Sequence, residues 1–139
     1  MRKLLITFVV ALVLFATLVM AMTIRDDIDM INVVPGSMAS AEASFSVLQD
    51  KDTGGHKVRA TVYFNDLMNE PGEVFEGWLV DEDTEYKLSL GAFVPNRNGR
   101  GTFSFRQTMV NFYLYDKIVI TKEDVMDENP NPDTPILVG

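Results

Sequence analysis

Two short acidic segments carry the residue types that could hold a cation. The first places Asp50 and Asp52 ahead of two glycines, a spacing in which alternate carboxylates can surround calcium. The second places Asp81 and Asp83 in a run of acids. A helix-flanked calcium loop would also need a bidentate acid about twelve positions after the first ligand, and the first segment lacks both the acid and the helices. Ordinary solvated turns are therefore the favoured interpretation, with calcium as the alternative.

No other cluster in the sequence indicates a reaction. The one histidine, His56, lacks the thiolate and the second imidazole that a blue-copper centre would need, since the chain has no cysteine. Ser89 and Ser104 fall on predicted strands with no histidine in local register, so a serine nucleophile would have no base. Apart from the calcium alternative, we therefore expect no cofactor, and we expect that the protein is not an enzyme.

Aromatic residues with polar neighbours are the candidates for an interaction surface. Tyr63 and Tyr113 share their faces with polar residues, so we expect them to point outward and to contact a partner. Trp78 stands between Gly77 and Leu79 in a continuously apolar run, where burial is the expected outcome. The sequence thus predicts a binding surface that includes tyrosines.

Length and charge limit the protein to one domain and exclude polyanionic partners. The chain has 139 residues, of which 47% are hydrophobic and 23% charged, an ordinary composition for one packed domain. Its 20 acidic and 12 basic residues give a net charge of -8, so nucleic acid would be repelled. The lack of cysteine excludes disulfides and thiolate zinc sites.

An uncharged apolar run near the N-terminus predicts insertion into a membrane. The 21 residues from Leu4 to Ile24 would form a helix about 31 Å long, close to the hydrocarbon thickness of a bilayer. Arg2 and Lys3 precede the run, which places the N-terminus in the cytoplasm and the rest of the chain outside. Small residues ending at Ala21 also allow a cleaved secretory signal. Residues 1–24 are thus a transmembrane anchor or a signal peptide of an extracytoplasmic protein.

The remaining chain divides into a linker and a β-domain. Residues 25–42 combine acids, Pro35 and small residues, which predicts a linker or stalk, with a first edge strand or a juxtamembrane helix turn as the alternatives. Beyond them the apolar period becomes two, as in half-buried strands. Alternating segments lie around residues 44–47, 57–64, 86–90 and 102–106, and continuously apolar ones at 74–80 and 118–120. About seven strands and no helical period predict an antiparallel β-sandwich over residues 43–139.

Turn-forming residues separate the predicted strands at strand-length intervals. Among them, Asn98 and Gly99 supply the positive-φ residues of a tight hairpin. Because no disulfide can help, the apolar core must stabilise the fold by itself. The large side chains expected in this core are Phe45, Phe64, Phe75, Trp78, Phe93, Phe103, Phe105 and Tyr115.

Three stretches follow one another in a definite order. They are Val74–Asp81 with its Trp-Leu-hydrophobic-acid pattern, Ser89–Phe93 followed by the glycine-rich Asn98–Gly101, and Ile118–Glu123 before a proline-containing tail. Their order over residues 56–139 resembles the extracytoplasmic C-terminal domain of anti-sigma-K factors, which implies a β-sandwich outside the membrane. Those factors hold the sigma factor with a cytoplasmic domain, whereas only three residues precede the apolar run here. The resemblance therefore does not extend to sigma binding.

Together these features predict a non-catalytic extracytoplasmic module that binds a partner or serves a structural role. A protein partner or a second copy of the chain is the expected contact, and the membrane is another if the apolar run is retained. Such an interaction domain would show an exposed aromatic patch or an unpaired long edge strand. A calcium-stabilised cell-surface domain is the alternative.

Overall fold

The fold is built from strands, with one short 3-10 turn. The computed structural model describes residues 24–126, 128 and 131–139. The strands are β1 (Ile24–Asn32), β2 (Ser40–Gln49), β3 (His56–Asn65), β4 (Glu73–Val80), β5 (Lys87–Phe93), β6 (Gly101–Met109), β7 (Lys117–Asp124) and β8 (Thr134–Val138), and the turn η1 (Phe112–Leu114) precedes β7. The N-terminal apolar helix predicted from the sequence lies almost wholly outside these residues. Within them, no helix has the length and apolar character needed to cross a membrane.

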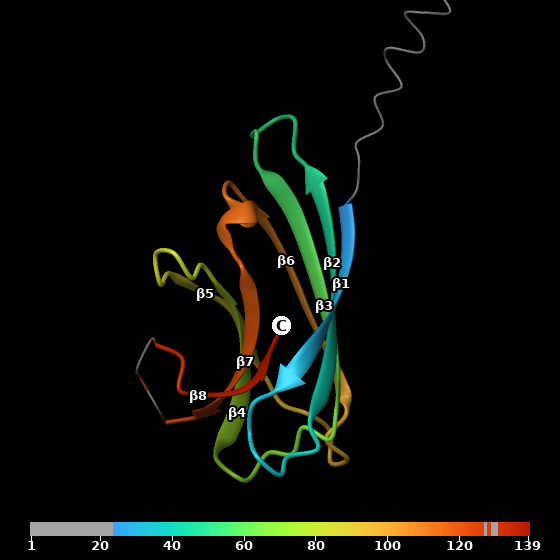
Figure 1. Ribbon diagram of the computed structural model, residues 1–139, viewed down its shortest axis with the longest axis vertical. Coiled ribbons are helices and arrows are strands. Elements are labelled where there is room, and N and C mark those ends of the chain that lie inside the picture. The colour runs from blue at the N-terminus through green and yellow to red at the C-terminus, as the bar shows by residue number, and fades with distance from the viewer. Residues whose placement is uncertain (1–23, 127, 129–130) are drawn as a thin grey trace, which may run out of the picture.

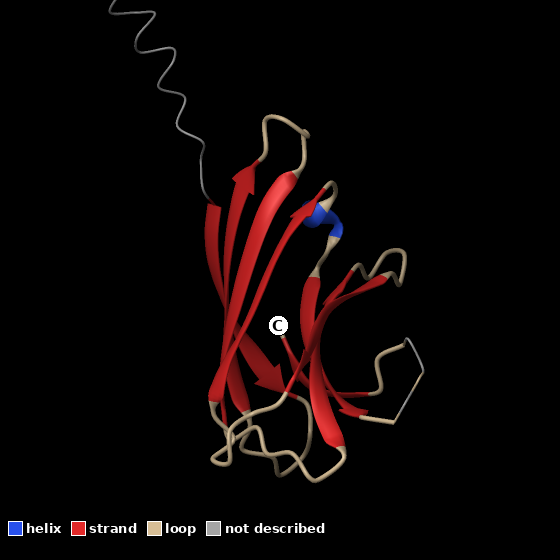
Figure 2. Ribbon diagram, turned by 180° about the vertical axis from the view of Figure 1, so that it is seen from behind, coloured by secondary structure: helices blue, strands red, loops and turns tan. Residues whose placement is uncertain are grey.

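All eight strands belong to one antiparallel sheet, in the order β5-β4-β7-β8-β1-β2-β3-β6 (Figure 1). The sheet bends back on itself, so that β1, β2, β3 and β6 face β4, β5 and β7 (Figure 2). The two halves are joined by β1 and β8, which pair only through Ile31 with Val138 and Asn32 with Leu137. The predicted all-β antiparallel fold is confirmed, with eight strands in one sheet instead of about seven.

The stretch predicted as a linker, residues 25–42, holds β1 and the start of β2, which corrects that prediction. Met30 is buried and Ile28 packs against the core, whereas Asp27 and Asp29 are exposed. This is the period-two alternation of a strand, obscured in the sequence because aspartate is depleted in strands. The alternative of a strand is correct for this stretch, but β1 lies between β8 and β2 and is therefore not the edge strand that the sequence predicted.

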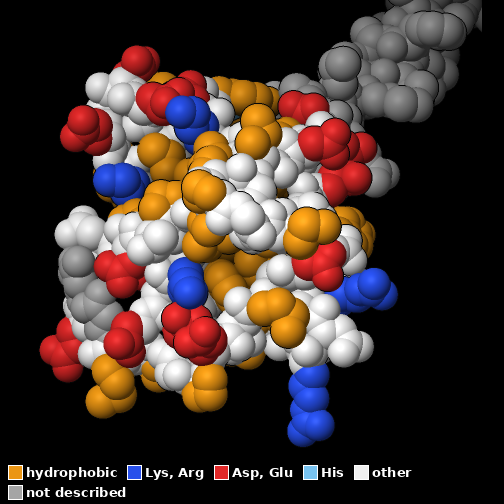
Figure 3. Space-filling view, turned by 60° about the horizontal axis from the view of Figure 1, so that its bottom comes forward, with side chains coloured by type: hydrophobic (Ala, Val, Ile, Leu, Met, Phe, Trp, Pro, Cys, Tyr) orange, Lys and Arg blue, Asp and Glu red, His pale blue; other side chains and the backbone are white. Residues whose placement is uncertain are grey.

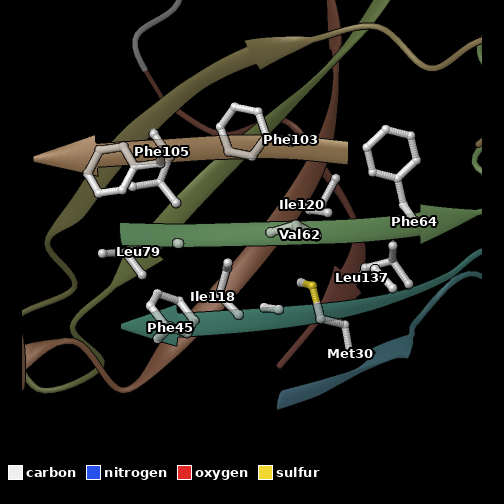
Figure 4. Close-up of a cluster of buried hydrophobic side chains, with 14 of the residues drawn as sticks. Met30, Phe45, Val62, Phe64, Leu79, Phe103, Phe105, Ile118, Ile120 and Leu137 are labelled. Atoms are coloured by element: carbon white, nitrogen blue, oxygen red, sulfur yellow. The ribbon is translucent and has the colours of Figure 1, made fainter. Parts of the chain in front are cut away.

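Strict alternation in β2 and β3 builds one wall of the core. Val58, Val62 and Phe64 point inward and are almost inaccessible, while their neighbours in β3 face solvent. Figure 4 shows Val62 and Phe64 in one cluster with Leu79 and Ile118, which come from the facing strands β4 and β7. Full burial of each large apolar side chain stabilises the fold by roughly 1.5–3 kcal/mol. Of the aromatic residues expected in the core, all are buried except Phe93 and Tyr115, which are half-buried.

Trp78 is buried as predicted, but on the opposite face of β4 from the main core. Its indole Nε1 donates to Thr121 Oγ1 at 2.8 Å, and the Thr121 hydroxyl donates in turn to the Glu123 carboxylate. Glu123 also accepts the backbone N–H of Asp133 at 3.1 Å. The segment leading into β8 therefore covers this face, and a polar chain satisfies the indole there.

The two end strands, β5 and β6, are joined by aromatic rings and do not pair with each other through their backbones. Phe93 of β5 stacks on Phe103 of β6 with ring centroids 4.8 Å apart. Phe64 lies 5.1 Å from Phe93 on the core side. Gly77 makes room for these rings, because a Cβ there would lie 3.1 Å from Phe103 Cε1. We call this junction, made by Phe93, Phe103 and Gly77, the seam.

Asn98 and Gly99 form a turn, but not the tight hairpin that the sequence predicted. Gly99 has a φ of 67°, and its N–H donates to the Asn96 carbonyl at 2.9 Å. The turn connects β5 with β6, and these strands do not pair. Instead, the Gly99 carbonyl accepts the Leu67 N–H at 2.9 Å, which docks the turn onto the β3–β4 connection.

Candidate functional site

A notch interrupts the sheet between β1 and β7. The strand that separates them, β8, has five residues, whereas β1 has nine and β7 eight. Gly139 exchanges two backbone hydrogen bonds of 2.9 Å with Ile118, and β1 pairs with β8 only at Ile31 and Asn32. Among the described residues, no strand therefore lies between the first half of β1 and the start of β7.

A cavity of about 260 Å³ fills this notch. Phe45 and Val47 of β2 and Leu79 of β4 line its apolar inner part. The remaining lining residues are Asp26 and Ile28 of β1, Phe112 and Tyr113 of η1, Tyr115 and Asp116 between η1 and β7, and Lys117 and Ile118 at the start of β7. We call this space, with these lining residues, the notch cavity. It is concave and mostly apolar, with a few polar groups, as small-ligand sites usually are.

Aromatic rings from three segments meet around the notch cavity. Phe112 lies 5.9 Å from Phe45 and 5.6 Å from Tyr113, measured between ring centroids. Tyr113 packs edge-on against His56 at 4.7 Å. The 3-10 turn that presents these rings is closed by a backbone bond of 3.2 Å from the Tyr115 N–H to the Phe112 carbonyl. The rings are therefore held by contacts on both sides of the notch.

The mouth of the notch cavity is acidic. Asp26 occupies the inner face of β1, opposite Phe45, where the alternation of the strand calls for an apolar residue. Asp116 accepts the Glu82 N–H at 3.0 Å with one carboxylate oxygen. The positive charge of Lys117 is offset by its ion pair with Glu82. Asp26 and Asp116 therefore leave a net negative field beside the aromatic rings.

The pKa of Tyr115 indicates that its surroundings at this site have low polarity. Its pKa is raised above the usual tyrosine value, chiefly by burial and also by the charges of Tyr86 and Asp81. The Tyr86 ring lies 6.4 Å from the Tyr115 ring, so the β4–β5 loop lies beside Tyr115. Burial disfavours the phenolate, and the hydroxyl stays protonated to higher pH.

The structure places the two predicted interaction residues in different regions. Tyr113 is 59% exposed and lies at the notch cavity. Tyr63 is 52% exposed on the outer face of β3 and does not line the cavity. No pattern in the sequence indicated Phe112 or Asp26 as site residues. Asp26 stands out only as an acid at an inward position of an alternating strand. This could be noticed only if β1 had first been predicted as a strand.

Asp50, the first of the predicted cation ligands, anchors the β2–β3 turn. It is buried, it accepts the Thr53 hydroxyl at 2.9 Å and the Asp52 N–H at 3.3 Å, and it is paired with Lys57 at 3.3 Å. Chiefly the Thr53 hydrogen bond, together with those from Asp52 and Lys57, lowers the pKa of this carboxyl below its usual value. These donors occupy the oxygens that a cation would use.

Asp81 repeats the same arrangement in the β4–β5 turn. It accepts the Thr84 hydroxyl at 2.6 Å and the Asp83 N–H at 3.0 Å, and these bonds, the Thr84 bond foremost, lower its pKa. Asp52 and Asp83 are exposed. Across the described part of the chain, no group of three or more acidic or histidine side chains is arranged to hold a metal ion. The calcium alternative stays a prediction, without a preformed site in these residues.

A second hollow, of about 420 Å³, opens at the other end of the molecule. Apolar side chains gather on this end (Figure 3). Met38 and Met68 lie at the hollow and are 80% and 63% exposed, and Phe75 also lines it. Lys122, which lines it too, is paired with Glu73 at 3.1 Å. This hollow has apolar surface but not the converging acids and rings of the notch cavity.

No family model matches the chain, and no curated protein or solved structure is similar enough to show a relationship. The resemblance to anti-sigma-K factors is therefore untested. Function has to be inferred from the site itself, through the shape and charge of the notch cavity.

Proposed function

We propose that the protein is a non-catalytic extracytoplasmic binding module whose notch cavity takes a small organic cation with an apolar body. The observation that carries this proposal is the position of Asp26. Its carboxylate lies on the inner face of β1, at the same cavity as Phe45, Phe112 and Tyr115. An acid that forms no ion pair among the described residues, beside the half-buried rings of Phe112 and Tyr115, favours a ligand that is apolar at one end and positive at the other.

The size and charge of the notch cavity support this ligand class. Its volume of about 260 Å³ is below the range of drug-sized ligands, roughly 300–1,000 Å³, and suits a ligand with about one ring. Aromatic faces attract cations, by about 0.5–2 kcal/mol per contact depending on solvent exposure. The net charge of -8 also raises the local concentration of cations around the protein.

The cellular setting and the finer fold are part of the same proposal. The apolar run at residues 4–24, preceded by Arg2 and Lys3, supports display outside the cytoplasmic membrane, as an anchored or a secreted protein. Two facing halves of one sheet support a sandwich-type fold like that implied by the resemblance to anti-sigma-K factors. A protein partner is supported by β6, a nine-residue edge strand that pairs only with β3.

Nuclear magnetic resonance titration with three ligands of matched shape tests the proposal. Benzylammonium, neutral benzyl alcohol and anionic benzoate are added separately to the full chain in neutral detergent. We expect benzylammonium to bind most tightly, benzyl alcohol more weakly and benzoate not measurably. Chemical-shift changes should centre on Phe112, Tyr115 and Ile28, because these residues line the notch cavity.

Two variants and one control make the result specific. Asp26→Asn removes the charge and should reduce benzylammonium binding about fivefold while leaving benzyl alcohol binding unchanged. Phe112→Ala should weaken both ligands. Tyr63→Ala alters an exposed aromatic residue outside the cavity and should change neither. Equal binding of benzoate and benzylammonium, or shifts centred on Tyr63, would contradict the proposal.

A further inference from the structure

Two arginines lie directly opposite each other on the outer face of the sheet. Arg59 of β3 is the antiparallel partner of Arg106 of β6. Both side chains are exposed, because the alternation of each strand turns them away from the core. Directly opposed side chains have Cβ atoms roughly 4.5–5.5 Å apart, so the two guanidinium groups share one small region of surface.

This region is hollowed and lined with hydroxyl groups. A depression of about 680 Å³ runs over the outer face of β2, β3 and β6, and both arginines line it together with Ser46 and Thr108. A second depression of about 280 Å³, lined by the same two arginines with Thr61 and Ser104, adjoins it. Hydroxyl donors therefore surround the arginine pair on both sides.

The arginine pair has no counter-charge within the described part of the chain, where no carboxylate forms an ion pair with Arg59 or Arg106. Lys57, which also lines the larger depression, is paired with Asp50. Like charges placed directly opposite in a sheet are destabilising. A protein with a net charge of -8 thus carries a local positive site at a cost to its own stability.

We propose that Arg59 and Arg106 bind a phosphate group, as a free phosphate ester or as a phospholipid headgroup. Guanidinium groups bind phosphate through two parallel hydrogen bonds, and flanking hydroxyls supply further donors. The net negative charge repels a long polyanion, but screening over about 8–10 Å leaves a single phosphate exposed mainly to the local pair. This site is separate from the notch cavity and does not depend on the ligand proposed there.

The position of the pair gives the lipid source a physical basis. Arg25 of β1 is the register partner of Ser46, which is the partner of Arg59, so residue 25 begins the row that ends at Arg106. The apolar run predicted to insert into a membrane ends at residue 24. Strands lie about 4.8 Å apart, which puts the arginine pair within roughly 15 Å of the end of that run.

The test uses the full chain in a neutral, phosphate-free detergent, with the arginine side-chain N–H signals as the readout. Phenyl phosphate and inorganic phosphate are titrated at constant ionic strength, with chloride as the reference. We expect saturable shifts of the Arg59 and Arg106 signals with both phosphates. Arg59→Gln or Arg106→Gln should weaken phosphate binding about tenfold.

Arg97→Gln is the matched control, because it removes the same charge from an exposed arginine outside both depressions. It should leave phosphate binding unchanged. The melting temperature offers a second readout. In chloride, Arg59→Gln should raise it because the like-charge contact is lost, and phosphate should stabilise the unsubstituted protein more than the variant.

The lipid arm repeats the phosphate titration in nanodiscs that contain phosphatidylglycerol. If the phosphatidylglycerol headgroups compete and weaken the apparent affinity for the titrated phosphates, the site is assigned to headgroups. If this affinity is unchanged, the site is assigned to soluble phosphate esters. Both results support a phosphate site. The proposal is overturned if neither arm shifts the Arg59 and Arg106 signals, if binding survives when Arg59→Gln and Arg106→Gln are combined in one variant, or if Arg97→Gln weakens binding equally.

Discussion

The notch and the seam are both places where neighbouring parts of the sheet are not joined by backbone hydrogen bonds, and only the seam is filled. At the seam, Phe93 and Phe103 stack across the junction at 4.8 Å, and Gly77 provides the space. At the notch, Phe45 and Phe112 approach from opposite sides with centroids 5.9 Å apart, beside a cavity of about 260 Å³. The difference is that rings contact each other in one gap and surround an open volume in the other.

This difference indicates where the molecule can change without unfolding. Filled space contributes to stability through dispersion and removal of apolar area from water, whereas an open cavity forfeits those contacts. Carboxylates line the notch, but the seam is made of Phe93, Phe103 and Gly77. The seam should therefore govern stability, and the notch should govern binding.

Removing a ring from the seam should have the largest effect. Phe103 is buried and contacts Phe93, so Phe103→Ala should lower the free energy of unfolding by about 3–5 kcal/mol. Urea denaturation followed by tryptophan fluorescence measures this change. Phe103→Leu, which keeps most of the apolar volume, should cost about half as much. A loss below about 1 kcal/mol for Phe103→Ala would show that the rings do not hold the seam.

Filling the space at Gly77 should have the next largest effect. A Cβ at this position would lie 3.1 Å from Phe103 Cε1 and 3.6 Å from Leu90 Cβ, so Gly77→Ala should cost about 1–3 kcal/mol through overpacking. A double-mutant cycle with Phe103→Leu checks the cause. If the ring is responsible, the cost of Gly77→Ala should fall in the Phe103→Leu background. Equal costs in both backgrounds would assign the effect to the backbone instead.

Strand patterns predicted the seam residues but not the seam itself. Phe93 and Phe103 are both among the large side chains expected in the core, and Phe103 lies in the alternating segment 102–106. Their stacking depends on the sheet bending until its end strands approach, which is a property of all eight strands together. The turn at Gly99 was also predicted only in part. Gly99 adopts a positive φ as expected, but its turn joins strands that do not pair.

The notch was harder to predict because it arises from unequal strand lengths. The sequence predicts a linker where β1 lies, because Asp27 and Asp29 hide its alternation, and β8 lies in the segment predicted as a proline-containing tail. The cavity exists only where β8 stops short of both neighbours. The polar neighbours of Tyr113 did single it out in the sequence, and in the structure its exposed position belongs to η1.

A ring at the notch should matter less for stability than one at the seam. Phe112 is half-buried and faces open volume, so Phe112→Ala should lower the free energy of unfolding by about 1 kcal/mol, near half the value of full burial. Denaturation in urea, run beside Phe103→Ala, gives the comparison directly. The same variant should lose most of its benzylammonium binding. A stability loss equal to that of Phe103→Ala would remove the distinction between the two gaps.

The smallest effect should appear only at alkaline pH, and it should be confined to the notch. The pKa of Tyr115 is raised by burial and by the Tyr86 and Asp81 charges, so the native state holds this proton more tightly than the unfolded chain. Stability from this source is fully present below the unfolded pKa of about 10 and is lost as pH rises through the higher folded value. Ultraviolet absorbance of tyrosinate should show one group that ionises late, and Tyr115→Phe should abolish it while Tyr63→Phe leaves it in place. Phe93 and Phe103 have no ionisable group, so Phe103→Leu at the seam should leave this late ionisation in place. A late-ionising tyrosine that is lost in Phe103→Leu but retained in Tyr115→Phe would mean that the two gaps are not independent.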